Sequence, residues 1–127
     1  MHGCVHLGCS LVDVRDVASA HLSAMTEPQA AGKRFICDAE FYWSQEIAHV
    51  LEEHFGQRGY RIPTRMLPNF AMYLVAIFDK SIRRILPDLG LRVTVSSEQL
   101  RNTLNWQPRP VEEAIVDTAE SLIEFGI

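Results

Sequence analysis

The chain has 127 residues, of which 47% are hydrophobic and 22% are charged, so it suits one globular domain with a modest core. Its net charge of −4 argues against a nucleic-acid partner. The longest apolar run, residues 70–78, is too short to cross a bilayer, and no basic stretch followed by an apolar core indicates a signal peptide. Three cysteines without framework spacing favour a reducing compartment, so we expect a cytoplasmic protein.

The first nine residues place four soft metal ligands in one short stretch: His2, Cys4, His6 and Cys9. Structural zinc sites usually draw pairs of ligands from separated elements, whereas this stretch would have to wrap the ion alone. We therefore interpret it as a loop without a metal and keep a metal site as the alternative.

Residues 11–18 predict a strand that turns directly into a helix. The apolar residues at 11, 12 and 14 suit a short half-buried strand, and Asp16 then has the position of an N-cap. Small and apolar residues continue at helical spacing as far as Thr26. We expect Asp13 and Arg15 to leave the core face together and to form caps and a salt bridge. Alternatively, Arg15 faces a substrate cleft.

The next segment predicts a second short strand at residues 34–37, in which Cys37 is a small buried hydrophobe rather than a nucleophile. Ser44 is the predicted N-cap of a helix that runs to about Phe55. The apolar stripe of that helix consists of Ile47, Val50, Leu51 and Phe55. The glycines at 56 and 59 end the helix, and this stretch lacks the strand context of a dinucleotide loop.

Residues 69–86 predict the longest helix, with Pro68 at its start. Its first half is apolar nearly all round, so it must be buried on several sides. Four of its side chains are either core or the lining of an apolar substrate pocket: Phe70, Tyr73, Leu74 and Ile77.

The last third predicts a short strand at residues 93–95, a helix capped by Ser96 or Ser97 that runs to about Leu104, and a proline-flanked turn at residues 106–110. Trp106 and Arg109 are expected to pack and to hold that turn in place. The final helix starts at residue 110 or 111 and ends at Gly126. Its predicted buried face consists of Val111, Ile115, Thr118, Leu122 and Phe125.

Five blocks, in this order, resemble the extended short-chain dehydrogenases/reductases of the NAD-dependent epimerase/dehydratase superfamily, and the dihydroflavonol-4-reductase and aldehyde-reductase-like branch above all. The blocks are Val-Asp-Val-Arg-Asp-Val-Ala-x-Ala-His-Leu at 12–22, Gly-Lys-Arg-Phe-Ile-Cys at 32–37, Pro-Thr-Arg-x-Leu-Pro-Asn at 63–69, Trp-x-Pro-Arg-Pro-x-Glu-Glu-Ala-Ile at 106–115 and Asp-Thr-Ala-Glu-Ser-Leu at 117–122.

This resemblance implies a mixed α/β fold that is mostly helical with a few short strands. It implies that residues 1–127 form a single partial domain, the C-terminal, substrate-side portion of a Rossmann-type reductase. In the intact family, NAD(P) transfers hydride to or from a small carbonyl substrate. The chain lacks the family's glycine-rich turn, and its three tyrosines are followed four residues later by Glu46, Thr64 and Ile77, not by the lysine of the family's catalytic pair.

Two hypotheses follow. In the first, the chain is the substrate-binding portion of an NAD(P)-dependent carbonyl reductase or epimerase; alone it binds no cofactor tightly and is inactive, and its N-terminal dinucleotide-binding half is missing. None of the family's catalytic residues has a counterpart here. In the second, the chain is a stand-alone binding or dimerisation module that uses the apolar helix at residues 69–86. Neither hypothesis includes a nucleic acid or a membrane as a partner.

Overall fold

Two short strands and six α-helices make up the part of the chain that the computed structural model describes, residues 3–126 without the side chains of residues 71, 78, 80 and 81. The elements in order are β1 (Gly8–Leu11), α1 (Val14–Thr26), β2 (Glu40–Trp43), α2 (Ser44–Phe55), α3 (Asn69–Phe78), α4 (Lys80–Ile85), α5 (Glu98–Leu104) and α6 (Val111–Glu124). This confirms the expected composition of helices with a few short strands. In the described residues, none of the helices has the length and apolar character needed to span a membrane.

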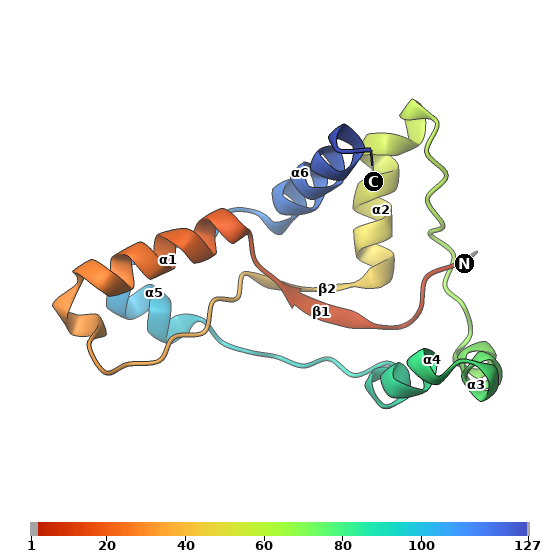
Figure 1. Cartoon of the computed structure of the whole chain (residues 1–127), viewed down its shortest axis with the longest axis horizontal. Coiled ribbons are helices and arrows are strands. Elements are labelled where there is room, and N and C mark those ends of the chain that lie inside the picture. The colour runs from red at the N-terminus through yellow and green to blue at the C-terminus, as the bar shows by residue number, and fades with distance from the viewer. Residues whose placement is uncertain (1–2, 127) are drawn as a thin grey trace.

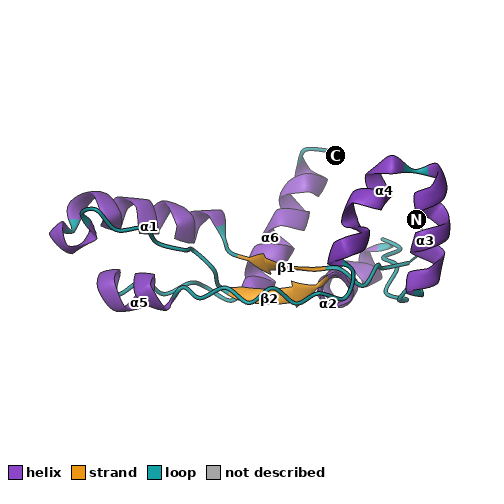
Figure 2. Ribbon diagram, turned by 90° about the horizontal axis from the view of Figure 1, so that it is seen from below, coloured by secondary structure: helices purple, strands orange, loops and turns teal. Residues whose placement is uncertain are grey.

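The strands β1 and β2 form an antiparallel ribbon, and the helices are arranged around it (Figure 1). Gly8 lies opposite Trp43, and Leu11 lies opposite Glu40. A Cβ atom at Gly8 would overlap the Phe41 ring, so any other residue at this position of the ribbon would force that ring to move. The helices α1 and α5 lie at one end of the ribbon, while α3 and α4 lie at the other end. Seen from below, α1 lies over α5 (Figure 2).

The junction between β1 and α1 lies earlier than the sequence pattern predicts. The strand ends at Leu11, and the helix begins at Val14 because Asp13, not Asp16, is the N-cap. The Asp13 carboxylate accepts a hydrogen bond of 2.7 Å from the backbone N–H of Arg15. The prediction of Asp16 as the cap was therefore wrong: Asp16 lies inside the first helical turn and is buried.

The helix α2 ends at Phe55 as predicted, but the prediction of Ser44 as its N-cap was wrong: Ser44 is the first helical residue, and Trp43 occupies the N-cap position. The Trp43 amide donates 2.8 Å to the Glu46 carboxylate, whereas the Ser44 hydroxyl donates to the carbonyl of Val5. Gly59, with φ of 90°, follows the turn after this helix as expected. Of the two serines predicted to cap α5, Ser97 occupies the N-cap position without a capping hydrogen bond, and Ser96 Oγ accepts 3.3 Å from the Glu98 N–H. The helix α6 starts at Val111, one of its two predicted starts.

Residues 69–86 are not one helix. The chain leaves helical geometry at Asp79, whose φ and ψ are −116° and 110°, so α3 and α4 are separate. The buried side chains described on α3 are Met72 and Ala76, which lie one turn apart on a single stripe. The burial on several sides that its apolar sequence indicates is therefore not provided within the described structure; the side chains of Phe78 and Lys80 lie outside the described part.

The predicted strands at residues 34–37 and 93–95 are also absent from the described structure, where both segments are coil. A strand requires a neighbour for its backbone N–H and C=O groups, and neither segment has one here. The second strand is formed instead by residues 40–43, whose partner is β1.

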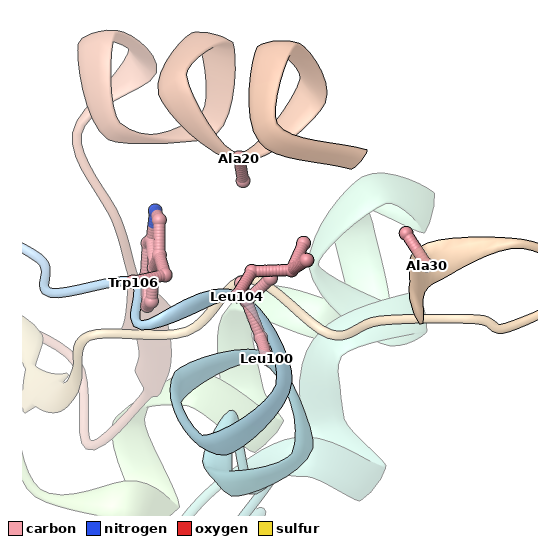
Figure 3. Packing of buried hydrophobic residues seen from close by; sticks show 5 residues of the cluster. All are labelled: Ala20, Ala30, Leu100, Leu104 and Trp106. Carbon is pink, nitrogen blue, oxygen red and sulfur yellow. The ribbon is translucent and has the colours of Figure 1, made fainter. Parts of the chain in front are cut away.

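The main core cluster lies between α1 and α5 (Figure 3). It consists of Ala20, Ala30, Leu100, Leu104 and Trp106. Val12, Phe35 and Cys37 pack against it while half-buried. This cluster joins residues that are up to about ninety positions apart, so α1 and α5 hold each other in place.

One aspartate connects this cluster to the turn before α6. The Trp106 indole N–H donates 2.8 Å to the carbonyl of Asp16. The backbone N–H of Arg109 donates 2.8 Å to Asp16 Oδ2, and the Arg109 Nε–H donates 3.1 Å to Oδ1. The expectation that Trp106 and Arg109 hold this turn is confirmed, and Asp16 is the group that they bind. We refer to these three residues as the Asp16 clasp.

We predict that Asp16→Asn lowers the free energy of unfolding by about 2 kcal/mol, since it weakens charge-assisted hydrogen bonds at a carboxylate that is only 5% exposed. Urea unfolding at neutral pH measures this difference. The matched control is Asp88→Asn, because Asp88 is an exposed aspartate and its replacement should change stability by less than about 0.5 kcal/mol. An equal, small effect of the two substitutions would contradict the importance of the clasp.

Candidate functional site

Arg15, the charged residue predicted to face a substrate, lies in an ion cluster between α1 and α6. Its Nη2 atom lies 2.6 Å from Asp13 Oδ2, 2.6 Å from Asp117 Oδ2 and 3.7 Å from Glu113 Oε1. Its Nε–H donates 2.9 Å to Asp13 Oδ1, so the pair with Asp13 is bidentate. Three carboxylates therefore surround this guanidinium, which is the predicted salt bridge with two additional partners. A role for Arg15 at a substrate stays a prediction.

The ion cluster shifts the pKa values of its central pair. Hydrogen bonds from the Arg15 side chain lower the pKa of Asp13 to about 2, against the opposing effect of desolvation. The hydrogen bonds to Asp13 and Asp117 raise the pKa of Arg15. Both groups are charged at neutral pH, so the cluster is a structural connection between α1 and α6 that depends on charge.

The four apolar residues proposed for a substrate pocket lie on one helix and point to solvent. Phe70, Tyr73, Leu74 and Ile77 are 56–68% exposed. We call these four residues the α3 apolar face. The helix α3 lies at the other end of the ribbon from α1, the helix to which Arg15 belongs (Figure 1). The structure therefore does not bring the predicted pocket residues together with Arg15.

A hollow that the sequence patterns did not identify lies between α2 and α6. It has a volume of about 280 Å³ and a mainly apolar lining: Leu11, Val12, Ile47, Leu51, Val111, Ala114, Ile115, Thr118, Ala119 and Leu122. We call it the α2–α6 groove. Its walls include residues of the apolar stripes predicted for α2 and α6. The sequence patterns predicted each stripe but not that the two stripes face each other. Because the groove is open, its lining residue Leu122 stays 45% exposed. The prediction of a buried face was wrong for Thr118, Leu122 and Phe125, which are all exposed; Phe125 is 75% exposed and does not line the groove.

Neither junction between a strand and a helix fits a dinucleotide. A pyrophosphate binds at a helix N-terminus that has free amides and a close glycine backbone. At the start of α1, the acidic residues Asp13 and Asp16 occupy that position. At the start of α2, the first free amide already binds the carboxylate of Glu46. No step of cofactor chemistry can therefore be assigned to these described residues.

The N-terminal cysteines and histidines are separated rather than gathered. The Cys4 thiol donates 2.8 Å to the carbonyl of Pro63, and the ring of His6 lies 4.6 Å from that of Trp43. Desolvation raises the pKa of the Cys4 and Cys37 thiols, which disfavours the reactive thiolate. Cys9 is exposed on β1, and His2 lies outside the described residues. Within residues 3–126, we find no group of three or more metal-binding side chains.

We predict that the contribution of Asp13 to stability disappears in acid. Its pKa is lower in the folded chain than the ordinary 3.8, so the ion pair stabilises the fold above about pH 4 and is lost as the pH falls towards about 2. Asparagine is an equally good N-cap, so Asp13→Asn removes the charge and keeps the cap. Wild type should be more stable than Asp13→Asn at pH 6, and the difference should vanish by about pH 2.

Urea unfolding of both proteins across this pH range measures the effect. Arg15→Gln is the control, since it removes the partner and should make the Asp13→Asn substitution nearly neutral at every pH. A difference between wild type and Asp13→Asn that does not change with pH would contradict the assignment.

No profile of a known protein family matches the chain. Among curated proteins, it is 32% identical over 114 residues to an uncharacterized oxidoreductase of Saccharomyces cerevisiae, a match that covers 89% of this chain and 28% of that protein. It is 26% identical over 114 residues to the NADPH-dependent methylglyoxal reductase of the same yeast, with 90% and 29% of the two chains covered. The chain thus spans less than a third of the length of these curated relatives.

The fold is also that of solved reductases. The crystal structure of yeast methylglyoxal/isovaleraldehyde reductase Gre2 complexed with NADPH superposes with a TM-score of 0.69 at 27% identity, over 97% of this chain and 35% of that one. Both sequence and structure therefore match over nearly the whole of this chain. In sequence and in fold, the chain is therefore similar to one part of longer reductases, as its resemblance to the extended short-chain dehydrogenases/reductases implies.

Proposed function

We propose that this chain is the substrate-side part of an NAD(P)-dependent reductase that acts on a small carbonyl compound. The observation that carries the proposal is the match of about nine-tenths of the chain to reductases more than three times as long as the matched segment. One relative with a stated activity is an NADPH-dependent methylglyoxal reductase. In this proposal, the cofactor and the catalytic pair belong to the part of such enzymes that the chain does not match.

The charges and the exposed surfaces support this assignment. The junctions of β1 with α1 and of β2 with α2 carry acidic groups where a dinucleotide needs free amides, so cofactor binding must come from elsewhere. The α2–α6 groove and the α3 apolar face are apolar surfaces of a kind that soluble proteins usually cover with a partner or a ligand. We assign the α3 apolar face to the substrate side, since its aromatic and aliphatic side chains suit an apolar substituent of the carbonyl compound.

We predict that the purified 127-residue chain does not oxidise NADPH in the presence of methylglyoxal above the rate of a protein-free blank. The physical reason is that its sequence has neither the glycine-rich turn that approaches a pyrophosphate nor a tyrosine followed four residues later by a lysine. Absorbance at the NADPH band measures the rate, and the yeast methylglyoxal reductase is the positive control. Turnover by the chain alone would refute the prediction.

A chimera tests the positive half of the proposal. The segment of the yeast reductase that this chain matches is replaced by this chain, and we expect NADPH-dependent reduction of small carbonyl compounds to return. In that chimera, Leu74→Asp should raise KM for apolar substrates with little change for methylglyoxal, because a charge on the α3 apolar face opposes apolar contact. Leu22→Asp, at a leucine exposed on α1, is the matched control. A folded chimera that is inactive on every carbonyl compound would contradict the proposal.

The exposure of the α3 apolar face favours a second candidate function, in which the chain is a stand-alone module that dimerises through residues 69–86. Its four side chains are each more than half exposed, as an interface is before assembly. Burying them would contribute roughly 25 cal/mol for each Å² of apolar area removed from water.

Sedimentation separates the two candidates. A module should form a discrete dimer at low micromolar concentration, and Leu74→Asp should shift it to monomer while Leu22→Asp leaves it unchanged. The reductase proposal expects instead a monomer that aggregates as concentration rises, because its apolar surfaces lack their cover.

A further inference from the structure

Two apolar surfaces of this chain stay open in the described structure, the α3 apolar face and the α2–α6 groove. The four residues of the face lie at positions i, i+3, i+4 and i+7 of α3, which is the spacing of the anchors that a helix inserts into a groove. In both ribbon views, α3 lies beside α4 at one end of the strand ribbon and away from α6 (Figure 1 and Figure 2). The two surfaces of one molecule therefore do not cover each other.

The lengths of the helices suit a contact between these surfaces. The helix α3 has 10 residues and spans about 15 Å at the rise of an α-helix. The groove lies between α2, which has 12 residues, and α6, which has 14 residues. A third helix that lies along two others, with axes roughly 8–10 Å apart, is ordinary ridges-into-grooves packing. Both walls are therefore long enough to receive α3.

Charge is distributed unevenly along the chain, and the two surfaces have opposite signs. Residues 61–92, which include α3 and α4, contain six of the twelve basic side chains and two of the sixteen acidic ones. The helices α2 and α6 together contain eight acidic residues and no lysine or arginine. Each surface therefore repels a second copy of itself and attracts the other surface.

Several of these charges are exposed and form no ion pair with a described residue. On the acidic helices, Asp117 faces Arg15 and Glu120 lies 3.2 Å from Arg58, so these two carboxylates are already engaged. The exposed charges without an ion pair among the described residues are Glu52, Glu53, Glu112 and Glu124 on α2 and α6, and Arg61, Arg65 and Arg84 in the basic segment. These groups can form ion pairs between two molecules without breaking one within a molecule.

We propose that the α3 apolar face of one molecule docks into the α2–α6 groove of a second copy of this chain, with the arginines of residues 61–92 opposite the acidic helices. The charge complementarity of the two surfaces identifies the second copy as the occupant. The contact is heterologous, because each molecule contributes a different surface and keeps its other surface open. Association therefore continues head to tail beyond a dimer.

This inference goes beyond the proposed function. The proposed function gives the α3 apolar face a small molecule as its occupant in a longer reductase, whereas the head-to-tail contact uses only surfaces of the 127-residue chain.

Two variants, each of which closes one surface, test the contact. Leu74→Asp places a charge on the face, and Leu122→Lys places one in the groove. Each variant alone should weaken self-association by about tenfold or more, because a charge at the centre of an apolar contact is desolvated without a partner. An equimolar mixture should associate again and stop at a dimer, since one intact face and one intact groove remain. Sedimentation velocity over the micromolar range measures both results.

Matched controls separate the contact from general effects of the substitutions. Ile123→Lys changes the residue next to Leu122, which is 39% exposed and does not line the groove, and should leave association unchanged. Leu22→Asp on α1 is the control for the face. If circular dichroism shows that either test variant has lost helix, Ile77→Asp replaces the face variant and Thr118→Lys the groove variant.

Salt and residue-level spectra give two further readouts. Raising the ionic strength from about 0.05 M to about 0.5 M should weaken association by roughly fivefold, because it screens exposed ion pairs. Amide resonances of α2 and α6 in the isotope-labelled Leu74→Asp variant should shift when the unlabelled Leu122→Lys variant is added, while those of α1 should not.

The mixture decides the question. Its return to a dimer supports the head-to-tail contact. A wild-type chain that stays monomeric, or two folded variants whose mixture stays monomeric, overturns it. A discrete wild-type dimer that Leu122→Lys does not weaken shows α3 paired with α3, which supports the stand-alone module and overturns this inference. Aggregates that persist in both variants, or that salt strengthens, indicate non-specific contact and overturn it as well.

Anionic vesicles test the other occupant that a basic, apolar surface suits. We expect the chain not to float with phosphatidylserine vesicles, because its net charge is −4. Flotation that Leu74→Asp abolishes, together with a monomeric chain in solution, would make a membrane surface the occupant and overturn the proposal. None of these readouts uses reductase activity, so failure of the contact leaves the proposed function standing, and an inactive chimera leaves the contact standing.

Discussion

The contacts of Asp16 are the constraint on which the rest of the described fold depends. The strand β1 and the helix α1 are local in sequence, whereas the turn at residues 106–110, about ninety residues later, is joined to α1 by hydrogen bonds from Trp106 and Arg109. The carboxylate accepts two hydrogen bonds from Arg109 and the carbonyl accepts one from the indole, so a single residue sets both the position of α5 and the direction in which α6 leaves. Arg15 then ties α6 back to α1 through Asp117.

This arrangement explains why the junction at residues 11–16 contains two aspartates. The two aspartates at this junction have different roles: Asp13 caps α1, and Asp16 accepts hydrogen bonds from Arg109. Capping preferences do not distinguish Asp13 from Asp16. The hydrogen bonds from Arg109 identify Asp16 as the acceptor of the distant turn. A charged residue that looks like a helix cap can therefore be the acceptor of a distant turn, and burial of its carboxylate is the distinguishing property.

Elements determined by local chemistry could be predicted from the sequence, and elements determined by partners could not. The end of α2, and the starts of α5 and α6, follow from periodicity, glycine and proline. The break at Asp79, in contrast, interrupts an otherwise continuous helical pattern, and the coil at residues 34–37 contradicts a good strand pattern. The apolar stripes of α2 and α6 were each visible, but their meeting in the α2–α6 groove depends on contacts that no local pattern contains. The residues proposed for the candidate site do not lie on neighbouring elements, since α1, which carries Arg15, and α3 lie at different ends of the ribbon.

The small share of apolar side chains that are buried gives one explanation for the differences between sequence pattern and structure at residues 34–37 and 69–78. Of the ten buried hydrophobic side chains among the described residues, four are alanines, while fifteen large hydrophobic side chains are exposed. Burial of alanine removes little apolar area from water, so such a core contributes little free energy for a chain of this length. The sequence patterns at residues 34–37 and 69–78 are those of elements buried on more than one side. The described side chains of these segments are buried on one side only, which is the condition expected if, as in the proposed function, a further part of a reductase makes their second set of contacts.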